Sequence, residues 1–164
     1  PKPSSAASDV YKRQHLPWCD KKCPYCDFNI TTDSLNDSVR ELFNALKNDL
    51  DQSEQFINQR PFKSIYFGGG TPSKVPTSFI KDFLDFLHSK FKVVMNCEVS
   101  FEANPIDLTS DYIAELKDSG INRMSVGIQS FDDQCLGSLG RNHNASDSLK
   151  APVSYTHLTL PTKA

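Results

Sequence analysis

The chain of 164 residues has no strong excess of charge of either sign and no long apolar run. It carries 18 Lys and Arg against 20 Asp and Glu, a formal net charge of -2, so it offers no basic face of the kind that binds nucleic acid. No apolar stretch approaches the roughly 18 residues of a membrane-spanning helix. The first residues also lack the apolar core of a signal peptide. We therefore expect a cytoplasmic protein with no integral membrane segment and no nucleic-acid partner.

Cysteine is scarce and unevenly placed. There are five cysteines, an odd number, and Cys19, Cys23 and Cys26 fall within eight residues. Both facts argue against the disulfide framework of a secreted domain and favour a reducing compartment. Cys97 and Cys135 have no partner at a suggestive spacing, and we expect them to pack as small apolar residues.

Apolar residues between positions 15 and 150 alternate between helical and strand spacing. The expected elements are a helix over 34–52, a strand over 64–67, a helix that follows Pro76, a strand over 97–102, a helix from Thr109 or Ser110 to Gly120, a strand over 123–128 and a helical stretch from about Asp132. This order predicts right-handed βα units around a parallel sheet, either open or barrel-like. In such sheets, ligands bind in the loops at the carboxyl ends of the strands.

The two ends of the chain differ from the region between them. Residues 1–14 and 151–164 are rich in Ser, Thr and Pro and carry no pattern that continues into their neighbours. We expect both ends to be non-native additions, and we assign residues 15–150 to the folded domain.

The spacing C-x3-C-x2-C, at Cys19, Cys23 and Cys26, allows three thiolates to converge on one metal centre from a single loop. A structural zinc site needs four ligands, and neither His15 nor Asp27 stands at a usual zinc-ligand spacing. Three thiolates suit an iron-sulfur cluster that keeps one iron open. Zinc and free thiols without a metal are the alternatives.

Three further features fall in the loops that follow strands. Gly68–Pro72 forms a glycine turn that could present backbone N–H groups to a carboxylate or phosphate, although such a turn is often only a turn. Glu102 stands where it could accept hydrogen bonds from a ribose or an amine, or it could be a solvated acid. Gln129 and Arg141 are equally ambiguous, because an isolated arginine is usually a surface charge.

Four motifs in order resemble those of radical SAM enzymes, in particular the HemN/HemW group of coproporphyrinogen-oxidase-like proteins. The motifs are His15–Phe28 with the three cysteines, Ile65–Ser73, Glu102–Pro105, and Gly120–Phe131 followed by Leu139–Arg141. The resemblance implies a partial (β/α)6 barrel, of which this chain would hold about the first four βα units. It also implies a 4Fe-4S cluster on Cys19, Cys23 and Cys26, and S-adenosylmethionine as the cofactor cleaved by an electron from that cluster. By the same resemblance, the cofactor-binding residues are Tyr25, Gly69, Gly70, Thr71, Glu102, Gln129 and Arg141.

Two activities compete within this group. The oxygen-independent coproporphyrinogen III oxidases, which carry out oxidative decarboxylation of propionate side chains, resemble C-x3-C-x2-C-x-C, whereas Phe28 stands at the last of these positions here. Trp18 and Cys26–Asn29 look instead like the haem chaperones of the group, and we favour that function. The resemblance implies haem or a porphyrinogen as ligand, a flavodoxin- or ferredoxin-like electron donor and, for a chaperone, a haem-accepting protein.

The sequence departs from the group's pattern at three places. Arg13 stands where the group has a tyrosine two residues before His15. The sequence therefore predicts a first strand here less clearly than it predicts the other strands. Ile106 and Asp107 replace the usual glycine after Pro105, a change expected to have little consequence. The group's further βα units and C-terminal domain do not follow Arg141, so we expect the chain alone to expose apolar rows, to be poorly soluble or unfolded, and to be inactive.

Overall fold

The computed structural model describes residues 10–35, 37–57 and 60–156. Four strands form one sheet, in the order β1 (Val10–Leu16), β2 (Phe62–Gly69), β3 (Val93–Ala103) and β4 (Arg123–Val126), and every neighbouring pair is parallel. The expected parallel α/β sheet is therefore confirmed. No helix in the part of the chain described here is long and apolar enough to cross a membrane.

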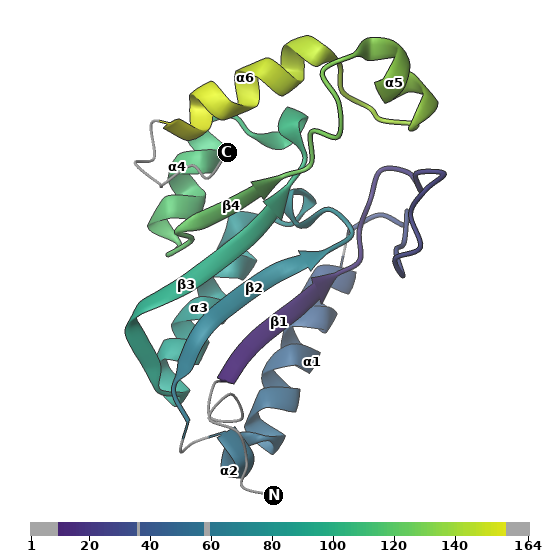
Figure 1. Cartoon of the computed structure of the whole chain (residues 1–164). Helices are drawn as coiled ribbons and strands as arrows, with labels where there is room; N and C mark the ends of the chain where they lie inside the picture. The colour runs from purple at the N-terminus through teal and green to yellow at the C-terminus, as the bar shows by residue number, and fades with distance from the viewer. Residues whose placement is uncertain (1–9, 36, 58–59, 157–164) are drawn as a thin grey trace, which may run out of the picture.

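The helices fall into two groups (Figure 1). Helices α1 (Ser38–Gln52), α3 (Thr77–Lys90) and α4 (Ser110–Asp118) pack against one face of the sheet, and the short α2 (Glu54–Ile57) follows α1. Helices α5 (Asp133–Ser138) and α6 (Ala145–Thr156) lie toward the carboxyl ends of the strands. Single 3-10 turns, η2 (Pro72–Lys74) and η3 (Pro105–Asp107), follow β2 and β3. Thr109 is the N-cap of α4, where its side chain accepts a hydrogen bond from the N–H of Tyr112.

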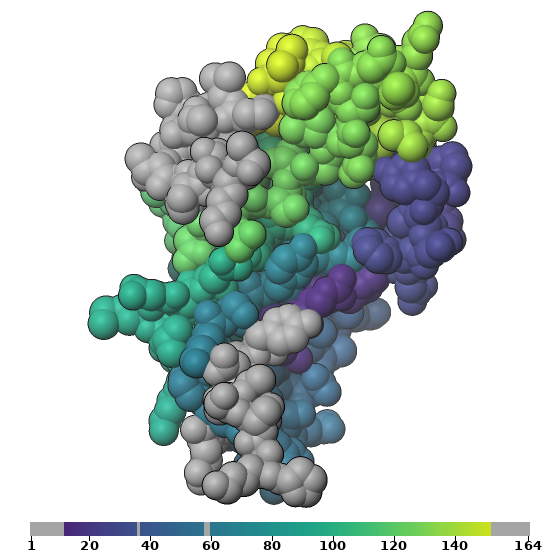
Figure 2. Space-filling view, viewed as in Figure 1, coloured from purple at the N-terminus to yellow at the C-terminus, as the bar shows by residue number. Residues whose placement is uncertain are grey.

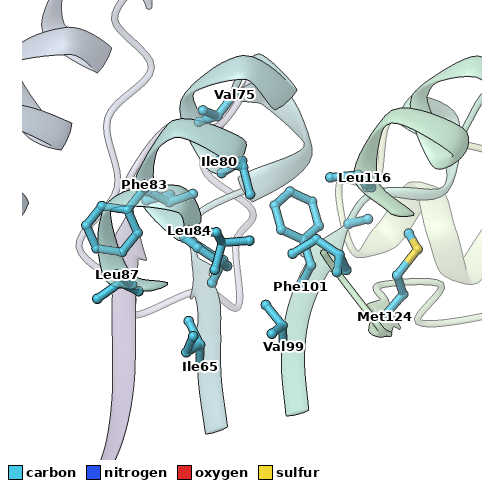
Figure 3. Close-up of a cluster of buried hydrophobic side chains, with 14 of the residues drawn as sticks. Ile65, Val75, Ile80, Phe83, Leu84, Leu87, Val99, Phe101, Leu116 and Met124 are labelled. Atoms are coloured by element: carbon cyan, nitrogen blue, oxygen red, sulfur yellow. The ribbon is translucent and has the colours of Figure 1, made fainter. Parts of the chain in front are cut away.

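The hydrophobic core lies between the sheet and these helices. Figure 3 shows Ile65, Val99 and Phe101 of the strands facing Ile80, Phe83, Leu84 and Leu87 of α3 and Leu116 of α4, and all eight are buried. The rings of Phe67 and Phe83 meet edge to face, with centroids 6.0 Å apart. The apolar row of the sheet is therefore covered, and the expectation that it lies exposed is wrong.

The opposite face of the sheet is polar. Side chains alternate between the two faces of a strand, so the residues between the core positions point away from the helices. In β2, β3 and β4 they include Ser64 and Tyr66, then Glu98, Ser100 and Glu102, and then Arg123 and Ser125. Arg123 Nη1 donates to Glu98 Oε2 at 2.8 Å, and Ser100 Oγ donates to Glu98 Oε1 at 2.9 Å. Because this face is polar and its side chains hydrogen-bond to one another, it can lie against water or a polar ligand and needs no helices to cover it.

The ends of the domain differ from the expected boundaries. Strand β1 begins at Val10, inside residues 1–14, which were expected to lie outside the folded domain, and it pairs with β2 along its length. Helix α6 likewise continues to Thr156, beyond residue 150. The first nine residues and residues 157–164 lie outside the described residues. A non-native origin of either end stays a prediction.

Candidate cofactor site

A cavity of about 260 Å³ lies at the carboxyl ends of the strands. Its walls come from the loop after β1 and from the segments that follow β2, β3 and β4. All ten residues singled out from the sequence line it, namely Cys19, Cys23, Tyr25, Cys26, Gly69, Gly70, Thr71, Glu102, Gln129 and Arg141. Their placement in loops at one edge of the sheet is what the βα order predicts.

The first wall is the loop of residues 17–31, called the cysteine loop below. Its base is closed by a bridge between Trp18 and Thr31, in which the N–H of Cys19 donates to the carbonyl of Thr31 and the N–H of Thr31 donates to that of Pro17, both at 2.9 Å. Within the loop the N–H of Cys26 donates to the carbonyl of Cys23 at 3.0 Å, so the chain turns between these two thiols. In Figure 2 this loop, in indigo, lies against the green segment that follows β4.

The three thiols of the cysteine loop are close enough to influence one another. Burial raises the pKa of Cys19, a hydrogen bond with Thr71 lowers it, and the charges of Cys26 and Cys23 raise it further. Cys19 Sγ and Thr71 Oγ1 are 3.3 Å apart. Among the described residues, no three His, Cys, Asp or Glu side chains stand at metal-binding geometry. The loop nevertheless brings three soft sulfur donors to one cavity, which is the donor set that an iron-sulfur cluster takes.

The glycine turn after β2 fits tightly against the base of the cysteine loop. The N–H groups of Gly70 and Thr71 donate to the carbonyls of Leu16 and Trp18 at 2.8 and 2.7 Å. A Cβ on Gly70 would lie 2.6 Å from the carbonyl oxygen of Pro17, so no other residue fits there without moving backbone. Gly69 has φ of +120° and lies against the ring of His15. The glycines therefore allow the close approach of β2 to the loop.

Glu102 is held by two donors at the edge of the cavity. The hydroxyl of Tyr66 donates to Oε1, and the N–H of Gly69 donates to Oε2 at 3.0 Å. Burial and the adjacent carboxylate raise the pKa of Tyr66 to about 12, so the phenol keeps its proton at neutral pH. Glu102 is consequently a fixed acceptor, with an orientation set from β2, rather than a solvated acid at a strand end.

Arg141 reaches across the cavity to the cysteine loop. Its Nη2 donates to the carbonyl of Gly127 at 2.7 Å and to Asn104 Oδ1 at 3.2 Å. Its Nη1 donates to the hydroxyl of Tyr25 at 3.3 Å and lies 3.9 Å from Cys23 Sγ. Its Nε is buried and has no protein partner. A cation beside a thiol in a partly buried site favours an anionic ligand.

Gln129 adopts an uncommon backbone conformation next to this arginine, with φ of +71°. A residue other than glycine rarely takes this conformation, and such strain concentrates at ligand sites. The strained residue lines the cavity, where it follows β4.

The sequence did not point to a polar network behind the cavity. Lys74 Nζ lies 2.9 Å from Asp20 Oδ2 and 3.1 Å from Asp107 Oδ1, and Ser73 Oγ donates to Asp107 Oδ2 at 2.6 Å. Asp107, one of the two residues that replace the group's usual glycine, takes part in this network, and the small consequence expected of that change stays a prediction. Asp20 and Lys74 are common residue types in ordinary loops, and only their meeting in space distinguishes them.

The two remaining cysteines lie away from the cavity. Cys97 is buried in β3, as expected. Cys135 is exposed on α5, so the expectation that it packs inside is wrong.

A parallel βα sheet with a loop-built cavity at the carboxyl ends of its strands is the architecture of the α/β-barrel class, in which ligands bind at this edge of the sheet. Compared with models of known families, residues 14–156 match the radical SAM superfamily, and the chain belongs to it. The solved structure described as coproporphyrinogen III oxidase (HemN) from Escherichia coli, a radical SAM enzyme, superposes with a TM-score of 0.80 at 21% identity. The match covers 92% of this chain and 34% of that one, so this chain forms part of such a barrel.

Curated relatives carry two descriptions. Heme chaperone HemW of Escherichia coli is 36% identical over 148 residues, which are 89% of this chain and 39% of that protein. Heme chaperone HemW of Bacillus subtilis is 35% identical and covers 81% of this chain and 35% of its own length. The mouse mitochondrial radical S-adenosyl methionine domain-containing protein 1 is 34% identical over 98% of this chain and 36% of its own. The chain thus spans less than two fifths of each of these relatives.

Proposed function

We propose that the cavity binds a 4Fe-4S cluster through Cys19, Cys23 and Cys26 together with S-adenosylmethionine. The observation that carries the proposal is that all ten residues picked from the motifs line one cavity. When bound, the reduced cluster would supply the electron that cleaves the sulfonium of S-adenosylmethionine.

Each wall of the cavity offers a different part of the cofactor site. The three thiols supply the metal ligands, and Arg141 places a cation beside Cys23 that offsets their negative charge. The turn at Gly69, Gly70 and Thr71 supplies the methionyl-binding wall. Glu102, fixed by Tyr66 and Gly69, is oriented to accept hydrogen bonds from the cofactor.

We infer further that the chain belongs to a protein of haem metabolism that acts as a haem chaperone. The identity to proteins described as HemW supports this inference. Phe28 adds to it, because an apolar ring lines the cavity at the position where the oxidases would have another cysteine. The inferred partners are haem, a flavodoxin- or ferredoxin-like electron donor and a haem-accepting protein. Free thiols at a cluster site require a reducing compartment, for which the cytoplasm is our expectation.

Anaerobic iron-sulfur reconstitution tests the cluster. The protein is expected to take up a cluster that, once reduced with dithionite, gives an electron paramagnetic resonance signal that changes when S-adenosylmethionine is added. Cys19→Ala, Cys23→Ala and Cys26→Ala should each lose that signal, whereas Cys135→Ala, an exposed cysteine outside the cavity, should keep it. A normal cluster in all three variants would end the proposal.

A second experiment separates haem binding from porphyrinogen chemistry. The reconstituted protein is mixed with haem, and with coproporphyrinogen III in the presence of S-adenosylmethionine and a reductant. Retention of haem on gel filtration without porphyrinogen turnover supports the chaperone. Steady decarboxylation with cleavage of S-adenosylmethionine would favour an oxidase instead.

A further inference from the structure

We propose that Lys74 is a positioning residue that fastens the cysteine loop to the rest of the cavity. It does so by pairing with Asp20, next to Cys19, while it is held by Asp107 on the opposite side. The role toward the cluster rests on the proposed function, but the fastening of the loop is a property of the chain itself.

Lys74, Asp20 and Asp107 form a partly buried cluster of three charges and not an isolated ion pair on the surface. Lys74 and Asp107 are largely buried, with 24% and 14% of their side chains exposed, while Asp20 is 48% exposed. Burial by itself would lower the pKa of Lys74, but hydrogen bonds to Asp20 and Asp107 raise it above its ordinary value. The ammonium group is therefore charged at neutral pH, and each carboxylate is paired with it.

One side of this cluster is rigidly held. Asp107 belongs to η3 and accepts a hydrogen bond from Ser73 Oγ, which in turn accepts one from the N–H of Asn104 at 3.0 Å. Lys74 itself ends η2. The segments after β2 and β3 are thus joined by hydrogen bonds that do not involve Asp20. Lys74 projects from these segments toward the cysteine loop.

The other side continues around the cavity. Asn142 Nδ2 donates to Asp20 Oδ2 at 2.9 Å, and Asn104 Nδ2 donates to Asn142 Oδ1 at 2.9 Å. Asn104 also accepts from Arg141, the arginine beside Cys23. Asp20 therefore receives one contact from Lys74 and one from Asn142, which ties the cysteine loop to the segments after β2 and β4 at once.

The positive charge of Lys74 also affects the electrostatics of the cysteine loop near Cys19. The carboxylate of Asp20 directly follows Cys19 in the chain and places a negative charge beside the proposed cluster ligands. Pairing with Lys74 offsets that negative charge. Without the lysine, Asp20 would keep its hydrogen bond from Asn142 but lose its cationic partner, and the cysteine loop would lose one of these two ties.

Limited trypsin digestion of the metal-free protein tests the fastening. Lys21 and Lys22, exposed on the cysteine loop, are reporter sites whose cleavage follows local opening. Lys74→Met should be cut there about fivefold faster, the factor expected for losing a partly exposed ion pair. Lys74→Arg should restore slow cleavage. Lys81→Met, which breaks an exposed pair with Asp85 on α3, is the matched control and should cleave at the original rate.

The reconstituted protein gives an independent measurement. Lys74→Met should shift the midpoint potential of the cluster to a more negative value, since a neighbouring cation is lost, and Asp20→Asn in the same chain should move it back. Asp20→Asn alone should also speed cleavage of the loop, which keeps the test valid if Lys74→Met does not fold.

The outcomes separate the two proposals. If the unaltered protein takes up no cluster, the proposed function fails while the digestion still decides the role of Lys74. If Lys74→Met and Asp20→Asn are both cleaved at the rate of the unaltered protein, the positioning role is overturned, whatever the cluster does.

Discussion

Glu102 and Tyr66 show how a single residue can be oriented from a neighbouring strand. Glu102 is the last residue but one of β3, whereas the hydroxyl that fixes one of its oxygens comes from Tyr66 of β2. The motif pattern identified Glu102, but nothing in it marked Tyr66, because the contact depends on which side chains face the same side of adjacent strands. The pairing of Lys74 with Asp20 and Asp107 likewise depends on which turns and loops meet in space, and no sequence pattern marks it.

Removal of the Tyr66 hydroxyl should loosen Glu102 without changing its charge. We expect Tyr66→Phe to weaken S-adenosylmethionine binding about tenfold, because a hydrogen bond to a charged group contributes on the order of 1.5 kcal/mol. Titration of the reconstituted protein by isothermal calorimetry measures this. Tyr112→Phe, which removes a hydroxyl bonded to the carbonyl of Val75, is the matched control. Equal affinity in both variants would show that Tyr66 does not orient the site.

His143 predicts a pH dependence of stability. Burial lowers its pKa below the ordinary value of 6.5, and its Nε2 donates to the carbonyl of Ile128 while its Nδ1 is buried without a partner. A depressed pKa means that the folded state favours the neutral ring. The neutral His143 ring therefore contributes its full share to the free energy of unfolding above pH 6.5. That share is lost as the pH falls below this value.

Urea denaturation at a series of pH values tests this sign. The free energy of unfolding should fall between pH 7 and pH 5, and His143→Gln, whose amide can still donate to Ile128, should flatten that fall. His88→Gln, at an exposed position on α3, should leave it unchanged. A steeper fall in His143→Gln would contradict the argument.

At the scale of elements, the sequence predicted the helices and inner strands well and β1 poorly. Helices α1, α3 and α4 carry apolar residues at regular helical spacing, and β2 and β3 are marked by apolar residues on their core-facing side. In β1 the corresponding position before Leu16 is Gln14, which is buried against the helices. A polar residue at a core position breaks the alternation by which strands are recognised, so this strand emerges only through its pairing with β2.

Gln14 should also cost stability. Its Nε2 is buried without a hydrogen-bond partner, and an unsatisfied buried polar group destabilises by about 1–3 kcal/mol. We expect Gln14→Leu to raise the midpoint of thermal unfolding by several degrees. Gln52→Leu, at an exposed position of α1, controls for added apolarity. A midpoint no higher than that of the control would mean that the amide finds a partner in solution.

At the scale of the whole molecule, the two faces of the sheet decide how the chain behaves alone. The helix-covered face is closed by its core, and the other face is polar, so exposed apolar rows no longer explain an unfolded chain. What remains open in the described sheet is the outer edge of β1 and of β4. Unpaired strand edges are templates for association.

We therefore expect the chain to unfold cooperatively when dilute and to self-associate as its concentration rises. Circular dichroism melts at low concentration, together with gel filtration and light scattering over a concentration series, measure the two behaviours. A shift to larger species that reverses on dilution would agree with pairing at the edges. A non-cooperative melt in dilute solution would mean that the chain alone does not fold. A monomer at every concentration would exclude association through the edges of β1 and β4.

The hydrogen bonds between the glycine turn and the base of the cysteine loop also have a consequence in time. They join Gly70 to Leu16 and Thr71 to Trp18, pairs that are far apart along the chain. Contacts that close long loops form late in folding, because the entropy of closure must be met first. The helices, whose contacts are local, should therefore form before this junction and before β1 pairs with β2 across the same distance along the chain. The cavity would then take shape only when β1 joins the sheet.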